Sequence, residues 1–373
     1  MQRPFRLARW AILAGALGAL PASAVPRFVP IGPSSVSSQV LGLSADGGVA
    51  VGTVKPEGAP NGIAFRWSEA DGLLPLAPGR AEAASGDGAT VVGTRPDASG
   101  KFHAFRWTAA DGVVEMNPPS FFFPPSGATD VSNDGTAIAL TQGPPVMPGS
   151  AGFHWTQADG FRSVGCPNSA FTRANAISGD GTVVVGSCAG DTLPPTAIRW
   201  TLEAGVFQPL ELGDHPFGVA QSAFGISADG AIVVGQVDSD AGPEAFVWSE
   251  AVSMIGIGDL EGGVFESSAS DASADGSVVV GWGSSESGRE AFVWDAAFDM
   301  RNLREVLEAA GLDLSGWRLS AATAVSDDGR TFAGWGVNPG GVEQGWIATI
   351  PEPGTAALLA LGVASLAAGV RRR

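Results

Sequence analysis

Short apolar runs, each bounded by glycine-rich turns, recur along most of the chain. In one such run, Thr182–Gly186, apolar and polar positions do not alternate, so the pattern predicts a strand buried on both faces. A shorter strand that ends in serine precedes it, as at Asn175–Ser178. Two further strands follow, as at Ala245–Trp248 and Phe207–Leu210. The pattern therefore predicts repeated units of four short strands, here called a to d in chain order.

Two motifs mark each unit and show that residues 40–348 form a repeat array. The first is a Ser-x-Asp-Gly turn, in which aspartate tolerates and glycine accepts positive φ. Its aspartates are Asp46, Asp87, Asp134, Asp180, Asp229, Asp275 and Asp328. The second is an Ala-Phe-x-Trp strand, whose four literal copies end at Trp67, Trp107, Trp248 and Trp294 and whose looser copies end at Trp155 and Trp200. A seventh copy, Gly345–Ala348, carries its Trp at the Phe position.

Seven units of four strands are typical of a seven-bladed β-propeller. The seventh unit ends after strand c, near Ile350, whereas Phe28–Gly32 has the pattern of a strand d without a unit before it. We therefore predict an all-β propeller over residues 25–350, closed by an N-terminal strand that leaves no open sheet edge. A β-solenoid or a pair of sandwiches is the alternative. The insertion Arg301–Gly311 has helical apolar spacing and predicts a short packed helix, with a partner-binding helix as the alternative.

Composition and charge exclude several classes of protein. The chain of 373 residues has 53 Gly and 26 Pro, which fits many turns, and its 45% hydrophobic content excludes wholesale disorder. Residues 25–350 contain 37 acidic and 15 basic residues. Such a surface repels phosphate backbones, so we expect no nucleic-acid partner.

The first residues have the pattern of a secretory signal peptide over residues 1–24. Three arginines precede a short apolar run, and Ala22 and Ala24 form a small-x-small cleavage site. An uncleaved membrane helix is the alternative. The pattern predicts export.

The last residues have three parts in a distinctive order, which we assign as a sorting segment over residues 351–373. Pro351, Glu352 and Pro353 precede an uncharged apolar stretch, residues 354–370, which is near the lower length limit for a transmembrane helix. Arg371, Arg372 and Arg373 follow and would stay cytoplasmic. This order resembles the PEP-CTERM sorting signal. The resemblance implies an exosortase partner, cleavage near Pro351–Pro353, a transient inner-membrane anchor and release to the cell surface or matrix. A plain tail anchor is the alternative.

The repeats resemble the HAF family of extracellular repeats, named for a His-Ala-Phe triplet. The triplet is literal once, at His103–Phe105, and the His is replaced in the other copies. The resemblance covers most of the predicted propeller and implies an extracellular protein, but it implies no activity.

Candidate chemistry is sparse. Cys166 and Cys188 allow one disulfide in an exported chain, or two buried thiols. The seven turn aspartates would bind calcium only if several oxygens met at one point, so turn formation is the favoured role. No catalytic grouping, metal pair or phosphate loop is evident, and we predict neither catalysis nor a cofactor.

Taken together, the sequence predicts a secreted, exosortase-processed propeller that is a binding or structural module of the cell surface or extracellular matrix. Its expected partners are exosortase, an extracellular polysaccharide or another surface protein, and the membrane through the C-terminal helix before processing. The alternative is a propeller enzyme that acts on extracellular glycans. A carboxylate cluster with several aromatics in the central cavity would favour the enzyme, and a merely acidic cavity would favour the binding module.

Overall fold

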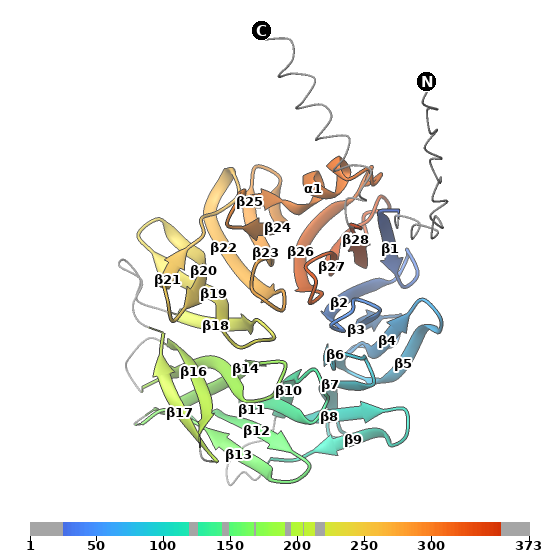
Figure 1. Cartoon of the computed structure of the whole chain (residues 1–373). Coiled ribbons are helices and arrows are strands. Elements are labelled where there is room, and N and C mark those ends of the chain that lie inside the picture. Colours follow the sequence, from blue (N-terminus) through green and yellow to red (C-terminus); the bar gives the residue numbers. More distant parts are fainter. Residues whose placement is uncertain are drawn as a thin grey trace, which may run out of the picture. The chain divides into compact units, whose positions relative to one another are not determined.

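The computed structural model describes residues 25–118, 126–143, 149–167, 169–190, 195–203, 205–212 and 221–351. Residues Pro26–Ile350 form one compact unit of seven four-stranded antiparallel sheets arranged in a ring (Figure 1). The predicted all-β, seven-bladed propeller is therefore confirmed.

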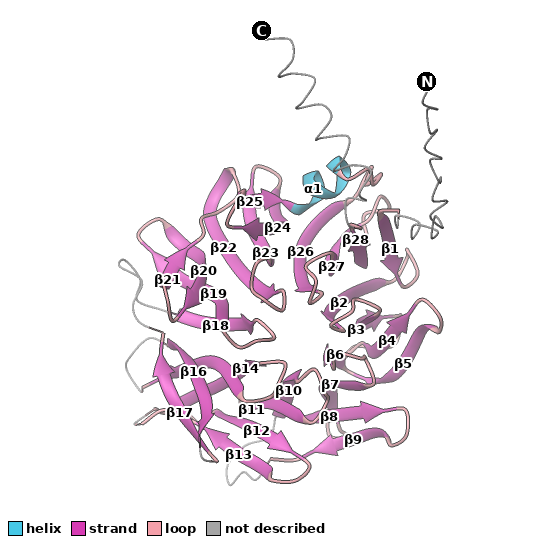
Figure 2. Ribbon diagram, viewed as in Figure 1, coloured by secondary structure: helices cyan, strands magenta, loops and turns pink. Residues whose placement is uncertain are grey.

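Strands make up almost all of the regular structure (Figure 2). Among the described residues there is one helix, and no helix is long and apolar enough to cross a membrane. The predicted signal peptide, with Ala22 and Ala24, and the predicted transmembrane stretch 354–370 lie outside the described residues.

Each of the first six blades runs in chain order from its innermost to its outermost strand, as the motif order predicts. Blade 1 contains β2 (Ser37–Leu43), β3 (Val49–Lys55), β4 (Ile63–Ser68) and β5 (Gly72–Pro78). Blade 2 contains β6 (Arg80–Ala84), β7 (Thr90–Pro96), β8 (Phe102–Thr108) and β9 (Gly112–Met116). Blade 3 contains β10 (Ser126–Val131), β11 (Ala137–Gln142), β12 (Ala151–Thr156) and β13 (Gly160–Val164).

The remaining blades follow the same plan, except that the last blade takes its fourth strand from the start of the chain. Blade 4 contains β14 (Phe171–Ile177), β15 (Val183–Ala189), β16 (Thr196–Glu203) and β17 (Val206–Glu211). Blade 5 contains β18 (Gln221–Ile226), β19 (Ile232–Ser239), β20 (Gly242–Ser249) and β21 (Ser253–Gly256). Blade 6 contains β22 (Gly262–Ala272), β23 (Val279–Ser285), β24 (Gly288–Asp295) and β25 (Asp299–Asn302). Blade 7 contains β26 (Arg318–Val325), β27 (Thr331–Val337), β28 (Glu343–Thr349) and β1 (Arg27–Ile31).

Strand β1 closes the ring, as the sequence predicts. It pairs antiparallel with β28, with Phe28 opposite Ala348 and Ile31 opposite Gly345. The Phe28 ring packs edge-on against Trp317, 5.0 Å away between ring centroids, and stacks on Trp346 at 6.3 Å. The first and last strands of the propeller are thus joined by both backbone pairing and aromatic packing, and β28 is left without a free edge.

In six blades a glycine in strand b lets the two innermost strands approach closely, and Leu140 occupies this position in blade 3. A Cβ on Gly52 would lie 1.9 Å from the carbonyl oxygen of Gln39, and one on Gly186 would lie 1.9 Å from that of Arg173. Beside this contact, every innermost strand has a β-bulge at the same repeat position. The bulged residues all line the central cavity and are Leu41, Glu82, Thr129, Asn175, Phe224, Ser270 and Thr323. The bulge therefore turns one extra side chain of each blade inward.

Apolar side chains fill the spaces between blades. The Phe of each literal Ala-Phe-x-Trp copy is fully buried, as at Phe65 and Phe246. In blade 7, Trp346 lies opposite Gly334, as Phe65 lies opposite Gly52, and it is also fully buried. Trp346 therefore occupies the Phe position, as predicted.

The insertion between blades 6 and 7 forms α1 (Leu303–Ala309), as predicted. The Asn302 side chain caps it by accepting the Arg304 amide at 3.0 Å. Leu303 and Leu307 are fully buried in the core shared by blades 6 and 7. The helix is therefore packed on the propeller through this face.

Cys166 and Cys188 form a disulfide. Cys166 follows β13 of blade 3, whereas Cys188 lies in β15 of blade 4. The bond therefore joins two neighbouring blades across a separation of 22 residues.

Replacement of both cysteines by serine is expected to lower the free energy of unfolding by about 3 kcal/mol. The disulfide restricts the unfolded chain, and for a loop of this length the lost conformational entropy corresponds to about that much stabilisation of the folded state. Urea unfolding with and without dithiothreitol measures it. The reductant should shift the wild-type midpoint and leave the double variant unchanged; an equal shift in both would contradict the disulfide's contribution.

Candidate functional site

In the Ser-x-Asp-Gly turns, the aspartate carboxylate is the centre of a local hydrogen-bond network. In blade 2, Asp87 Oδ1 accepts the Ala89 amide at 2.9 Å and the Ser85 hydroxyl at 2.7 Å. These two hydrogen bonds hold the pKa of Asp87 below its ordinary value. Ser85 Oγ also accepts the Thr90 amide at 2.9 Å, and Gly88 has a φ of +64°. The carboxylate therefore stabilises the turn that the sequence predicts.

The same serine-to-aspartate hydrogen bond recurs in the other six blades, at Asp46, Asp134, Asp180, Asp229, Asp275 and Asp328. Each blade contributes one such carboxylate. Over the described ranges, no group of three or more His, Cys, Asp or Glu side chains is placed to hold a metal ion. The hydrogen bonds show the turn role of these aspartates, and calcium binding remains for experiment to test.

Replacement of Asp87 by alanine is expected to lower the free energy of unfolding by about 1 kcal/mol, as for a lost capping side chain. Replacement by asparagine keeps an oxygen acceptor and should cost less. Thermal unfolding in calcium and in EDTA provides the control. The calcium alternative would be favoured instead if calcium raised the melting temperature of the wild type but of neither variant.

The residues that follow the turn serines form a closed hydrogen-bonded circle, which we call the turn ring. Its members are Ala45, Gly86, Asn133, Gly179, Ala228, Ala274 and Asp327, with Asp229 as the donor in blade 5. The backbone amide of each blade donates to the carbonyl of the next at 2.8 to 3.2 Å, and Asp327 of blade 7 donates to Ala45 of blade 1. The turn ring therefore ties all seven blades together where it borders the central cavity.

Three carboxylates of the innermost strands line the central cavity, namely Glu82, Asp130 and Asp271. Glu82 pairs with Arg80 of its own strand, and burial raises its pKa. Asp130 accepts the Val131 amide and, at 2.8 Å, the amide of Ile177 in the next blade. Asp271 likewise accepts the amide of Val325 in the next blade at 2.9 Å. The other five blades have small residues at this position, namely Gly42, Ala83, Ala176, Gly225 and Ala324. Each of the two aspartates thus joins its own blade to its neighbour.

Burial raises the pKa of both Asp130 and Asp271 to about 7. Asp130 and Asp271 are each partly exposed to the central cavity. The two spaces of the cavity that they line have volumes of only about 160 and 90 Å³. The charges of Asp130 and Asp327 further raise the pKa of Asp271. Burial also raises the pKa of Asp327, whose side chain accepts the Asn133 amide group at 3.2 Å. Phe224 is the one aromatic residue among the described residues that line these spaces.

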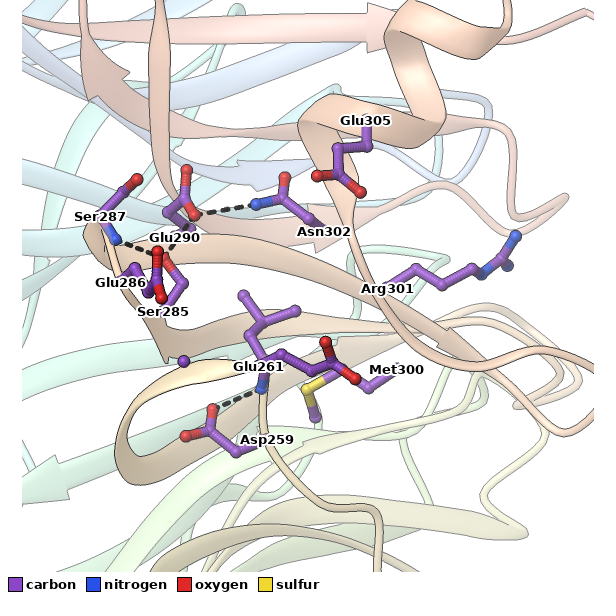
Figure 3. A pocket seen from close by; sticks show the side chains of 12 residues that line it. Asp259, Glu261, Ser285, Glu286, Ser287, Glu290, Met300, Arg301, Asn302 and Glu305 are labelled. Carbon is purple, nitrogen blue, oxygen red and sulfur yellow. Dashed lines mark hydrogen bonds between the residues drawn. The ribbon is translucent and has the colours of Figure 1, made fainter.

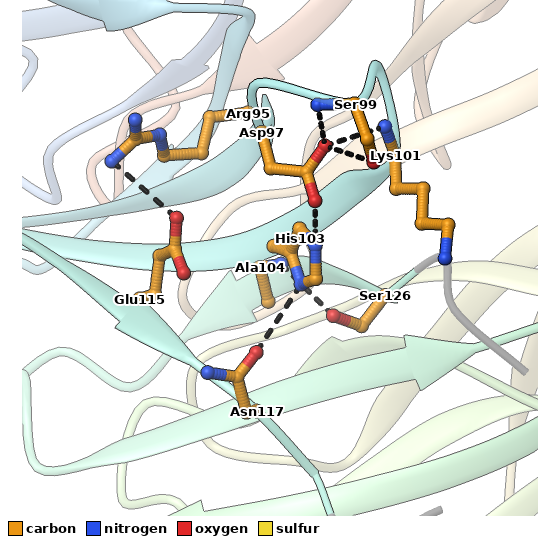
Figure 4. A network of polar contacts seen from close by, with 9 residues as sticks. All are labelled: Arg95, Asp97, Ser99, Lys101, His103, Ala104, Glu115, Asn117 and Ser126. Carbon is orange, nitrogen blue, oxygen red and sulfur yellow. Dashed lines mark hydrogen bonds and ion pairs between the residues drawn. The ribbon is translucent and has the colours of Figure 1, made fainter.

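His103, the literal histidine of the triplet, bridges two parts of blade 2 (Figure 4). Its Nε2 lies 3.3 Å from Asp97 Oδ2 in the turn between β7 and β8, and its Nδ1 lies 3.2 Å from Asn117 Oδ1 after β9. The Asp97 carboxylate also accepts the backbone amides of its own turn at Ser99 and Lys101. Both ring nitrogens of His103 therefore have a hydrogen-bond partner, the side-chain amide of Asn117 for Nδ1 and the carboxylate of Asp97 for Nε2.

The equivalent residue bridges the same two parts in blades 6 and 7. Glu290 Oε2 accepts the Ser285 hydroxyl at 2.6 Å and the Asn302 amide group at 2.9 Å (Figure 3). Gln344 donates to the carbonyl of Gly32 at 2.8 Å. In blades 2, 6 and 7 the first position of the triplet therefore connects the hairpin to the last strand, whether it holds His, Glu or Gln.

A cavity of about 670 Å³ lies on blade 6 (Figure 3). Its walls are the segment before β22, the hairpin between β23 and β24, strand β25 and the first turn of α1. The carboxylates in its lining are Asp259, Glu261, Glu286, Glu290 and Glu305. This cavity is within the range of small-ligand sites.

Sequence reasoning identified the turn aspartates and missed the other three sites. The turn ring had a signal, since the residue after each turn serine is Ala, Gly, Asn or Asp in all seven copies. Asp130 and Asp271 also had one, because each interrupts a position that is otherwise Gly or Ala. The blade 6 cavity needs three segments that only the fold brings together. His154 Nε2 is hydrogen-bonded to the backbone carbonyl of Gly181 at 3.1 Å, and His215 is outside the described residues.

Comparison with known families matches residues 349–373 to the PEP-CTERM protein-sorting motif. The match includes Pro351, Glu352, Pro353 and the terminal arginines. The motif is a substrate signal for exosortase, so it marks an exported protein that is anchored transiently in the membrane before processing. No curated protein sequence matches the chain.

Solved structures show likeness in fold alone. Oligogalacturonate lyase in complex with manganese is 14% identical, with a TM-score of 0.54 over 88% of this chain and 99% of that one. The β-propeller domain of the Trilobed protease from Pyrococcus furiosus is 7% identical, with a TM-score of 0.56 over 84% and 95%. That domain is described as having an open velcro topology, whereas β1 closes the ring here.

Prolyl oligopeptidase B from Galerina marginata is 13% identical, with a TM-score of 0.50 over 82% of this chain and 46% of that one. The chain thus spans about half the length of this enzyme, and it covers 52% of TolB from Acinetobacter baumannii. The likeness to the oligopeptidase concerns the fold alone, and its activity does not transfer through such low identity.

Proposed function

We propose that this chain is a non-enzymatic binding module of the cell surface or extracellular matrix, released there after exosortase processing. The observation that carries the proposal is a closed propeller followed directly by the sorting motif. A ring tied at β1 and around the turn ring is a rigid frame that presents fixed surfaces to a partner. The resemblance of its repeats to the extracellular HAF family fits the same destination.

The central cavity supports binding over catalysis. Among its carboxylates, Asp130 and Asp271 accept backbone amides of neighbouring blades, and Glu82 pairs with Arg80. Phe224 is the one aromatic residue beside them in the described lining. A glycan-cleaving site needs two carboxyl groups that flank a bound sugar, with room for the ring between them. A space of about 160 Å³ is small for a sugar chain. The cavity is acidic and narrow, which is the pattern expected of a module.

The alternative is a propeller enzyme acting on extracellular glycans. One observation favours it: oligogalacturonate lyase shares the fold along almost the whole of both chains. Its printed complex contains manganese.

One experiment separates the two. The exported portion, residues 25–350, is incubated with polysaccharide purified from the producing organism, and both pull-down and release of shorter oligosaccharides are measured. Retention without cleavage supports the module. Turnover of the polymer would establish the enzyme and overturn the proposal, as would the lack of retention on both the polymer and intact cell surfaces.

A further inference from the structure

The blade 6 cavity is formed by departures from the repeat. Strand β22 has 11 residues and extends beyond the usual start of an innermost strand, so that Gly262 pairs with Ser285. Helix α1 is present in this one place among the described residues and supplies Glu305 to the cavity wall. In repeat proteins, insertions of this kind commonly form the binding face.

The carboxylates around this cavity have no cationic partner in the described part of the protein. None of the five forms an ion pair, although eight arginine–carboxylate pairs involve other carboxylates of the described residues. Arg301, the one basic residue in the lining, pairs instead with Asp295. Figure 3 shows the Arg301 side chain extended away from Glu290. The cavity therefore keeps a strong negative charge.

Glu290 is the buried member of this group. It is 8% exposed, and its Oε2 is fixed by Ser285 and Asn302. Its Oε1 has no hydrogen-bond partner among the described residues, although the side chain lines the cavity. This oxygen is therefore open to the cavity and can accept a hydrogen bond from a ligand, and a hydrogen bond between a carboxylate and a cation is roughly twice as strong as one between neutral groups.

The cavity lining also includes apolar surface. Leu260 and Met300 contribute to it, and both pack on the core between blades 5 and 6. A lysine or arginine side chain has a long aliphatic stem and a cationic end, and such stems pack on apolar surface while the end meets carboxylates. The carboxylates are not grouped tightly enough to hold a metal ion in the described residues.

We propose that this cavity binds a basic segment of a partner protein, with a Lys or Arg stem against Leu260 and Met300 and its cationic end hydrogen-bonded to Glu290 Oε1. Glu261, Glu286 and Glu305 attract further basic residues of the same segment. This inference goes beyond the proposed function, because it needs neither a polysaccharide nor the sorting motif.

Isothermal titration of residues 25–350 with a tri-lysine and a tri-arginine peptide tests the proposal, with the side-chain-acetylated lysine peptide as the uncharged probe. We expect the basic peptides to bind and the acetylated one to bind at least tenfold more weakly. The Glu290→Gln variant and the double variant Glu261→Gln/Glu286→Gln should each weaken binding about tenfold, the effect of one charge-assisted hydrogen bond. Higher salt should weaken the wild-type affinity.

The matched control is Glu57→Gln/Glu250→Gln, which removes two exposed carboxylates from blades 1 and 5. Thermal unfolding verifies that all variants are folded, and Glu261→Gln/Glu286→Gln, in exposed loops, keeps the test valid where Glu290→Gln fails to fold. Equal weakening in control and cavity variants would overturn the proposal, because it would show only the effect of net charge. Tighter binding of a glucosamine trimer than of both peptides, or binding of calcium alone, would also overturn it.

Discussion

A chain that begins at Pro33, and so lacks β1, is expected to lose at least about 5 kcal/mol of unfolding free energy. Ile31 is fully buried, and Phe28 packs on Trp317 and Trp346. Truncation of a buried Ile costs about 2–5 kcal/mol and that of a Phe about 3–5 kcal/mol. The loss also exposes the edge of β28, so aggregation should accompany it. Urea unfolding followed by tryptophan fluorescence, against the chain that begins at Val25, measures the change.

Two controls separate the closing strand from a general effect of shortening. Ile31→Val should cost about 1 kcal/mol, since it removes one methyl group from the same site. A synthetic peptide of residues 25–32 added to the shortened chain should restore part of the lost stability by pairing with β28, and a scrambled peptide should not. Identical unfolding midpoints for the two chain lengths would show that the ring does not depend on β1.

The repeat carries most of the information about the fold. Seven Ser-x-Asp-Gly turns and the burial of strand b fix four-stranded blades, because the tight turn and the glycine contact between strands are local properties. Closure by β1 was also predictable, since Phe28–Gly32 is a strand without a unit and blade 7 lacks one. The placement of Trp346 at the Phe position was also predictable, because the seventh copy of the strand motif, Gly345–Ala348, shows it directly.

The candidate sites were harder to predict because they depend on which blades become neighbours. Asp130 and Ile177 are 47 positions apart, and Asp271 and Val325 are 54 positions apart. The packing of consecutive blades against each other directs these carboxylates to the amides of the next blade. The blade 6 cavity depends in the same way on α1 lying beside the β23–β24 hairpin, although the helix itself was predicted.

The propeller is expected to become less stable as pH rises from 5 to 8, because of Asp130 and Asp271. Their pKa is about 7 in the folded protein, above the ordinary value of 3.8. The folded state therefore retains protons that the unfolded state has already lost between about pH 4 and pH 7. This contribution to stability is complete below pH 4 and is lost as pH rises through 7. About two units of this shift lie between pH 5 and pH 8 and correspond to about 3 kcal/mol, and partial exposure to the cavity reduces our expectation in this range to about 2 kcal/mol for each carboxylate.

The turn aspartates do not obscure this window. Hydrogen bonds lower the pKa of Asp87 and several of its counterparts, so their stabilisation is present above pH 4 and is lost only at lower pH. Burial lowers the pKa of His154, so that residue acts in the opposite direction, with stability rising as pH increases. Burial raises the pKa of Glu82, so this residue acts in the same direction as Asp130 and Asp271. Because His154 and Glu82 are present both in the wild type and in a variant without the two aspartates, the difference between the two proteins isolates Asp130 and Asp271.

Asp130→Ala/Asp271→Ala is the suitable variant, since alanine occupies the same position in blades 2, 4 and 7 at Ala83, Ala176 and Ala324. It should be less stable than the wild type at pH 5, because the amides of Ile177 and Val325 lose their acceptors. Between pH 5 and pH 8 it should lose about 4 kcal/mol less stability than the wild type, so the two curves should converge or cross. Urea unfolding at both pH values measures this, with the exposed Asp240→Ala as control. Parallel curves of unfolding free energy against pH would show that Asp130 and Asp271 are ionised throughout this range and that the central cavity is well solvated.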